Sequence, residues 1–123
     1  MGYRSDVVLV FYCASKDKDY PLLKLWVDEN MKEELAYMRV VNNGEWKGFK
    51  FSWENVKWYD GYEDVERVRA AMQRFKEVFD EVDAPEFSYE FIRVGENDDD
   101  VEIYRSRDAV GLMYVSREIV GEF

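Results

Sequence analysis

The spacing of apolar residues changes several times along the chain, and each spacing predicts a different element. Residues 5–13 are apolar on both faces of an extended chain, which is typical of a central strand covered on both sides. In residues 49–54, aromatic side chains alternate with polar ones, as in a strand with one face in water. From residue 87 onward the pattern predicts three more strands joined by short turns, at 87–94, 101–105 and 110–117.

Two segments between these strands have apolar residues three and four positions apart, the spacing of a helix with one buried face. The first begins near Asp19 and fades by Met38, with Glu33 and Glu34 on its solvated side. The second follows Asp60, and a glutamate three residues later has the spacing of a capping box. We therefore expect two helices, of which the second has the more regular apolar stripe.

The order of these elements is strand, helix, one or two strands, helix and then three strands. It predicts an α+β fold in which two helices pack on one face of a mostly antiparallel sheet of four to six strands, ending in a C-terminal three-strand meander. Residues 1–123 form one domain, because the length suffices for a single core and no repeat or linker divides it. The pattern leaves open whether the second face of the sheet is covered.

Composition narrows the classes of function. Hydrophobic residues make up 47% of the chain and aromatic residues 17%, enough to fold around a core. The formal charge is −10, from 27 acidic and 17 basic residues. Such a surface repels phosphate backbones and anionic lipids, so we expect no direct binding of nucleic acid and none of membranes. It favours basic partners, although acidity also serves simply to keep an aromatic-rich protein in solution.

The absence of histidine and the single cysteine, Cys13, exclude Ser-His and Cys-His catalysis and the usual zinc sites. No intramolecular disulfide can form, which fits a reducing cytoplasm, and Cys13 is expected in the core. The longest apolar run, residues 7–14, is too short to span a bilayer, and no signal peptide precedes it. We expect a cytoplasmic protein without a cofactor.

Residues 91–104 form the most unusual segment: an apolar strand, a highly charged turn and a second apolar strand. We call the charged part the acidic turn; its acidic residues are Glu96, Asp98, Asp99, Asp100 and Glu102. It can be a solvated hairpin tip, a metal-binding loop or a surface that docks on a basic partner. Its spacing does not fit an EF-hand and strands flank it, so no metal site is predicted.

An aromatic block precedes the second helix. For Trp58 and Tyr59 within it, burial in the core and contact with a partner are equally open. The carboxylates of Asp60, Glu63 and Asp64 follow directly, and carboxylates beside aromatic rings can acquire raised pKa values suited to acid-base chemistry. The same residues in a first helical turn complement the helix dipole. Because no phosphate-binding loop or nucleophile motif accompanies them, no catalytic residue is predicted.

Three pieces of the chain form a recognisable series: MGYRSDV at 1–7, WENVKWYDGYEDV at 53–65 and FIRVGENDDDVE at 91–102. In this order they resemble the motifs of a family of small uncharacterised proteins of tailed bacteriophages and prophages. Those proteins open with Gly-Tyr-Arg-Ser, carry a Val-Lys-Trp-Tyr block before a helix and end with a Gly-Glu-acidic segment. The family has no established activity, so no catalytic residue carries over. The resemblance implies a phage protein acting inside a bacterial cell.

Together these features predict a protein-binding module. A narrower form of this prediction is an acidic inhibitor of a basic host or defence complex that handles nucleic acid. The acidic turn would contact the partner, with Trp58 and Tyr59 as apolar anchors. One alternative is a self-associating structural module that uses the second helix or an uncovered sheet face as its interface. Another is an enzyme that uses the carboxylates between Asp60 and Asp64.

Overall fold

Within the residues that the computed structural model describes, 2–80, 84–97, 99–116 and 118–123, five antiparallel strands form a sheet in the order β2–β3–β1–β4–β5. These strands are β1 (Ser5–Ala14), β2 (Met38–Asn42), β3 (Trp46–Val56), β4 (Ser88–Gly95) and β5 (Val101–Arg105). The other elements are α1 (Tyr20–Asn30), the 3₁₀-helix η1 (Lys32–Tyr37), α2 (Glu63–Phe79), β6 (Met113–Ser116) and β7 (Glu118–Gly121).

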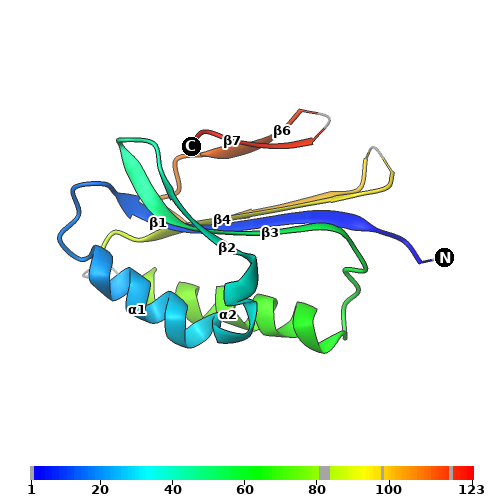
Figure 1. The fold of residues 1–123 in the computed structure, drawn as a ribbon, viewed down its shortest axis with the longest axis horizontal. Coiled ribbons are helices and arrows are strands. Elements are labelled where there is room, and N and C mark those ends of the chain that lie inside the picture. The colour runs from blue at the N-terminus through cyan, green and yellow to red at the C-terminus, as the bar shows by residue number, and fades with distance from the viewer. Residues whose placement is uncertain (1, 81–83, 98, 117) are drawn as a thin grey trace.

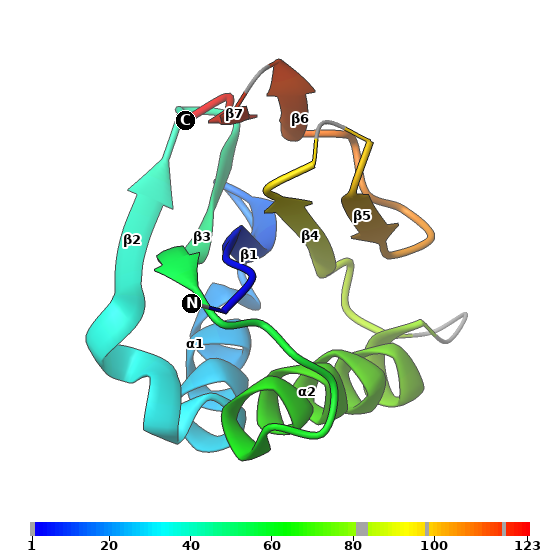
Figure 2. The ribbon, with the colours of Figure 1, turned by 90° about the vertical axis from the view of Figure 1, so that its right-hand side faces the viewer.

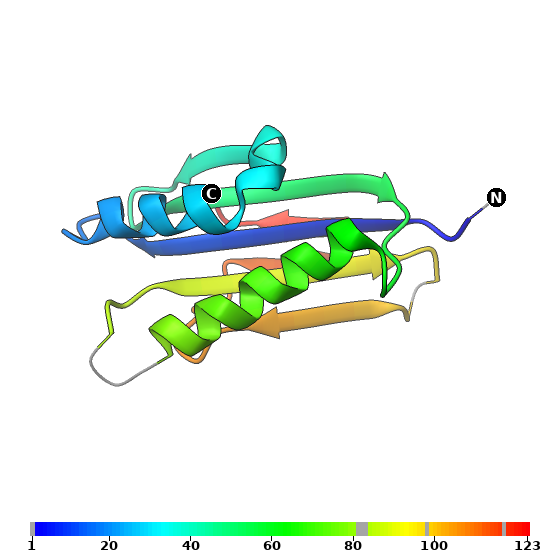
Figure 3. The ribbon, with the colours of Figure 1, turned by 90° about the horizontal axis from the view of Figure 1, so that it is seen from below.

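The helices α1 and α2 lie on one face of the sheet, and the hairpin formed by β6 and β7 lies on the other (Figure 1, Figure 2). Seen from the helix side, α1 covers the half of the sheet around β3 and α2 the half around β4 (Figure 3). The order β1-α1-β2-β3-α2-β4, with β1 between β3 and β4, is the split βαβ arrangement of ferredoxin-like domains. The predicted α+β class with two helices on one sheet face is confirmed.

The C-terminal part differs from the predicted meander. β4 and β5 pair as expected, but the segment predicted as a third strand, 110–117, does not continue from β5. Its backbone N–H groups at Gly111, Leu112 and Met113 donate instead to the buried carboxylate of Glu90. These bonds turn the chain across the sheet, where β6 pairs with β7.

The main core lies between the sheet and the helices. Val7, Leu9 and Phe11 on β1 face Val27 of α1 and Phe75 of α2, and all five are fully buried. Each fully buried side chain of this size contributes about 1.5–3 kcal/mol relative to exposure in water. The burial of Cys13 in the same core, as predicted, raises the pKa of its thiol to about 11.

A second core lies between the sheet and the C-terminal hairpin. Val10 and Tyr12 on β1 and Ile92 on β4 are buried there beneath Leu112 and Met113. This second core explains why β1 is apolar on both faces. It also answers the question that the sequence left open, because the hairpin covers the face of the sheet opposite the helices.

Two predicted helix boundaries are wrong. α1 ends at Asn30, and the chain continues through η1 rather than as an α-helix to Met38. The expected capping box at Asp60 and Glu63 does not form, because the chain turns through a glycine with positive φ between them and the Asp60 carboxylate pairs with Arg69.

Candidate functional site

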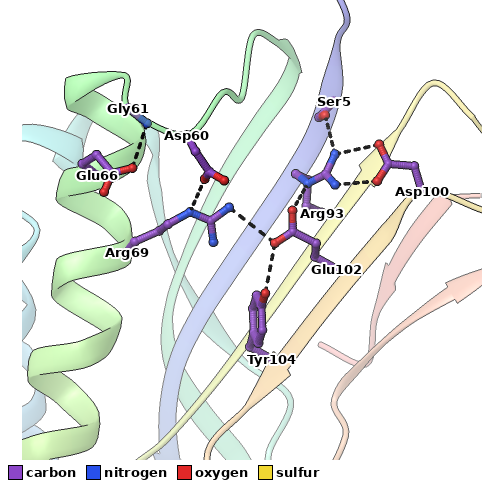
Figure 4. Close-up of polar contacts among 9 residues, drawn as sticks. All are labelled: Ser5, Asp60, Gly61, Glu66, Arg69, Arg93, Asp100, Glu102 and Tyr104. Atoms are coloured by element: carbon purple, nitrogen blue, oxygen red, sulfur yellow. Dashed lines mark hydrogen bonds and ion pairs between the residues drawn. The ribbon is translucent and has the colours of Figure 1, made fainter.

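The acidic turn is held by an arginine of the sheet. Arg93 on β4 donates to both carboxylate oxygens of Asp100, at 2.6 and 3.1 Å, and through Nε to Glu102 at 2.6 Å (Figure 4). Its guanidinium also donates to Ser5 on β1 at 3.1 Å. The hydrogen bonds from Arg93, together with one from the Tyr3 hydroxyl, lower the pKa of Asp100. Much of the charge of the turn is therefore neutralised internally.

A second arginine connects the acidic turn to α2. Arg69 lies 3.4 Å from Glu102 and 3.0 Å from Asp60, so it bridges strand β5 and the start of the helix (Figure 4). The Tyr104 hydroxyl also donates to Glu102, at 3.2 Å. Two carboxylates considered from the sequence for docking or catalysis, Glu102 and Asp60, are thus engaged in a network that joins helix to sheet.

Only part of the acidic turn remains as exposed charge. Glu96 and Asp99 are exposed, and within the described parts of the chain neither has an ion-pair partner. Glu96 accepts a hydrogen bond from the backbone N–H of Arg4 at 2.8 Å. Asp98 lies outside the described residues. The turn therefore offers a partner less negative charge than its sequence suggests.

The two predicted anchors differ in their environment. Trp58 is 8% exposed and packs between Trp53 and Phe91, with ring centroids 5.6 and 6.0 Å away. Tyr59 is half-buried and lies edge-on to Tyr62 at 5.2 Å. Trp58 is thus primarily a core residue, and its remaining surface contributes to a nearby pocket.

This pocket, about 530 Å³ in volume, opens where η1, the end of β3 and the start of α2 meet. Trp53, Trp58 and Val68 form its buried aromatic and apolar floor. Tyr37 stands at its rim with 55% of its surface exposed, and its ring lies 5.8 Å from that of Trp53. The size falls within the range of about 300–1,000 Å³ that is usual for ligand pockets.

Glu34 is the buried carboxylate of this pocket. Its side chain, 5% exposed, pairs with Nε of Arg67 on α2 at 3.2 Å, and Arg67 also lies 3.4 Å from Glu63. Desolvation raises the pKa of Glu34, and the hydrogen bond from Arg67 only partly offsets this effect. Arg67 thus shares its charge between two carboxylates.

The rim of the pocket is acidic. Glu33, Glu54 and Asp64 are exposed carboxylates that line it, and Lys57 is the basic group beside them. A shallower hollow of about 330 Å³ continues between η1 and α2, and shares Glu33 and Arg67 with the pocket. We call the pocket and this hollow together the acidic groove.

One polar atom of a residue that lines the pocket has no partner in the described part of the chain. The indole Nε1 of Trp58 is buried and has no hydrogen-bond acceptor among the described residues. Leaving such a donor without an acceptor costs about 1–3 kcal/mol. Few groups of this kind occur in native structures, so each one calls for a physical explanation.

Sequence reasoning did not find Glu34, and it placed this residue wrongly on the solvated side of the first helix. The residue lies three positions after Met31, which is buried, and therefore falls on the apolar stripe rather than beside it. The sequence did offer one signal for a buried carboxylate, because Glu34 stands at a position of the apolar stripe. The change from α-helix to the 3₁₀-helix η1, which turns Glu34 toward Arg67, was not visible in the pattern.

No protein-family model, curated protein or solved structure matches this sequence. In the described part of the chain, none of the helices combines the length and the apolar character needed to cross a bilayer. The acidic groove combines flat aromatic walls, an excess of carboxylates at the rim and one buried donor.

Proposed function

We propose that this protein is a binding module whose acidic groove docks a basic segment of another protein. The observation that carries the proposal is the combination, in one pocket, of an exposed aromatic ring at Tyr37 with the rim carboxylates of Glu33, Glu54 and Asp64, which form no ion pair among the described residues. Aromatic anchors supply contact area, and the acidic rim attracts a basic partner and orients it.

The acidic groove is a better docking site than the acidic turn. The groove has depth and apolar walls, whereas Asp100 and Glu102 in the turn are held by Arg93. Glu96 and Asp99 remain at the surface and would add to the long-range attraction of a positive partner. In this proposal the turn therefore influences the association rate more than the stability of the complex.

The resemblance to phage proteins gives this binding role a setting. In its narrower form, the protein acts in the cytoplasm of a bacterial host and inhibits a host or defence complex that handles nucleic acid. Such complexes carry basic surfaces for phosphate backbones, and an acidic groove competes for the same positive charge. The charge of −10 supports this form of the proposal.

The test is capture of partners from bacterial lysate by the tagged protein, at low and at high salt, followed by mass spectrometry. Two matched variants each remove two exposed carboxylates: Glu54→Gln with Asp64→Asn in the groove, and Glu96→Gln with Asp99→Asn in the turn. We expect the groove variant to lose a basic partner that the turn variant retains at equilibrium. Equal loss with both variants would contradict a role for the groove and indicate only general charge attraction.

Self-association is the second candidate, and the structure changes its most suitable interface. The apolar stripe of α2 is buried and the hairpin packs on the second sheet face, so only the polar outer side of the helix remains exposed at the predicted interfaces. The outer strands β2 and β5 instead present exposed apolar side chains at Val40, Ile103 and Tyr104. A monomer elution volume that does not change with dilution would exclude this alternative.

A further inference from the structure

We propose that the pocket of the acidic groove accepts the guanidinium group of an arginine side chain. This inference rests on the proposed function and deepens it, because it names the chemical group of the basic partner that enters the pocket. It depends on three features of the described residues: the arrangement of the rings, the balance of charge and the unpartnered indole donor.

The rings offer flat surfaces at the mouth and the floor of the pocket. Tyr37 and Trp53 have their ring centroids 5.8 Å apart with planes inclined at 42°, and Trp58 follows at 5.6 Å from Trp53. A planar, delocalised guanidinium stacks on such faces, and this attraction grows as the site loses water. The exposed ring of Tyr37 is the surface that an entering group meets first.

The charges of the pocket leave a surplus of carboxylates. Arg67 is balanced by Glu34 and Glu63, with which it forms ion pairs of 3.2 and 3.4 Å. The remaining rim groups, Glu33, Glu54 and Asp64, outnumber the single basic residue Lys57. An entering cation is therefore attracted to the pocket, and carboxylates can accept two parallel hydrogen bonds from a guanidinium.

The unpartnered N–H of Trp58 requires an acceptor, which an arginine side chain does not carry. The peptide that carries the arginine has backbone carbonyls. Because the indole nitrogen is buried, such a carbonyl would reach it only after the side chains around Trp58 shift. The volume of about 530 Å³ leaves room for part of this peptide beside the side chain.

Lysine and anionic groups fit the pocket less well. The ammonium of lysine is compact and strongly hydrated, so it gains less from flat aromatic walls than a guanidinium does. An anion would meet the exposed carboxylates of Glu33, Glu54 and Asp64 at the rim. The pocket is therefore selective for a planar cation rather than for charge of either sign.

The direct test uses N-acetyl-arginine methylamide as the probe, with the lysine and the citrulline analogues as controls. Citrulline has the shape of arginine without its charge. Two-dimensional NMR of the indole N–H signals reads out binding in the ¹⁵N-labelled protein. We expect the arginine probe to shift the signals of Trp53 and Trp58 saturably. The signal of Trp46 should not move, because its ring packs on Tyr12 in the core on the opposite face of the sheet.

The groove variant with Glu54→Gln and Asp64→Asn should bind the arginine probe about tenfold more weakly, and the matched turn variant with Glu96→Gln and Asp99→Asn should bind it unchanged. Equal binding of citrulline would overturn the inference, because charge would then play no part. Equal binding of lysine would overturn the selectivity for guanidinium. Absence of a saturable shift with arginine would overturn the whole inference.

The probe and the lysate capture separate the two proposals. If a basic partner is captured through the groove but the arginine probe does not bind, the inference about arginine fails and the binding role stands. If the probe binds but no protein is captured, the pocket recognises guanidinium groups and the proposed docking of a protein fails.

Discussion

The hydroxyl of Tyr12 donates a hydrogen bond to the carboxylate of Glu90 within the second core, where both side chains are fully buried. The same carboxylate accepts the backbone N–H groups of Gly111, Leu112 and Met113 at 3.0, 2.9 and 3.1 Å. One buried carboxylate thus connects two strands of the sheet to the segment that leads into the C-terminal hairpin.

Replacing Glu90 should therefore destabilise the protein strongly. Glu90→Gln keeps the shape of the side chain but replaces one carboxylate oxygen, an acceptor, with an amide group that donates. At this place the Tyr12 hydroxyl and three backbone N–H groups already donate. We expect a loss of about 3–5 kcal/mol in the free energy of unfolding, measured by urea denaturation. Tyr12→Phe should cost less, about 1.5–3 kcal/mol, because it removes the hydrogen bond to Glu90 and the one from the backbone N–H of Val110, but leaves the other donors of Glu90 in place.

The exposed Glu77 on α2, whose carboxylate accepts a side-chain hydrogen bond only from Gln73 among the described residues, provides the matched control, and Glu77→Gln should stay within about 0.5 kcal/mol. A loss below about 1 kcal/mol for Glu90→Gln would show that the carboxylate does not hold the hairpin.

Removing Arg93 should also destabilise the protein, because Asp100 and Glu102 would face each other without their shared counter-charge. We expect Arg93→Gln to lower the free energy of unfolding by about 2–4 kcal/mol. Adding Asp100→Asn should cost less than the sum of the two single changes, with a coupling of about 1–3 kcal/mol, measured by a double-mutant cycle in urea.

Arg107 is the control for this cycle. Its guanidinium lies 4.0 Å from Asp108 and both side chains are largely exposed, so Arg107→Gln should change stability by less than about 1 kcal/mol. Additive effects of the changes at Arg93 and Asp100 would contradict the ion-pair account of the acidic turn.

The residues of these networks show what the sequence could and could not predict. The two apolar faces of β1 correctly predicted a covered strand, because burial on each face requires apolar residues at every position. The role of Glu90 could not be predicted, since its backbone donors lie 21 to 23 residues further along the chain and Tyr12 lies 78 residues before it. The exposed charge of the acidic turn was overestimated, because the pairing of Arg93 with Glu102 depends on the register of β4 and β5.

Asp100 should make stability depend on pH at the acidic end of the range. Its pKa is lowered in the folded protein from the ordinary value of 3.8, so its carboxylate stabilises the fold above that value. This contribution is lost as the pH falls through the lowered pKa, because the folded state must then bind the proton. Below pH 3.8 we therefore expect the stability of the Asp100→Asn variant to fall less steeply than that of the parent protein. Parallel pH profiles of urea unfolding would contradict this prediction.

Glu34 should produce the opposite dependence. Desolvation raises its pKa above the ordinary value of 4.5, and a raised pKa means that the folded protein holds the proton more tightly than the unfolded chain. Its contribution to stability is then fully present below about pH 4.5 and is lost as the pH rises through the raised pKa. Glutamine does not titrate, so Glu34→Gln should gain stability relative to the parent between pH 4.5 and neutral pH.

The same series in the Arg67→Gln background isolates the cause. Arg67 lowers the pKa of Glu34 through its hydrogen bond and charge, so its removal should raise that pKa further and move the transition to higher pH. Glu33→Gln, at the exposed neighbouring position, should move the transition slightly to lower pH, because the charge of Glu33 contributes to the raised pKa of Glu34. If the stability difference between Glu34→Gln and the parent stayed constant across this range, Glu34 would titrate like an exposed carboxylate. The charge of the Glu34 carboxylate would then not depend on its burial in the pocket.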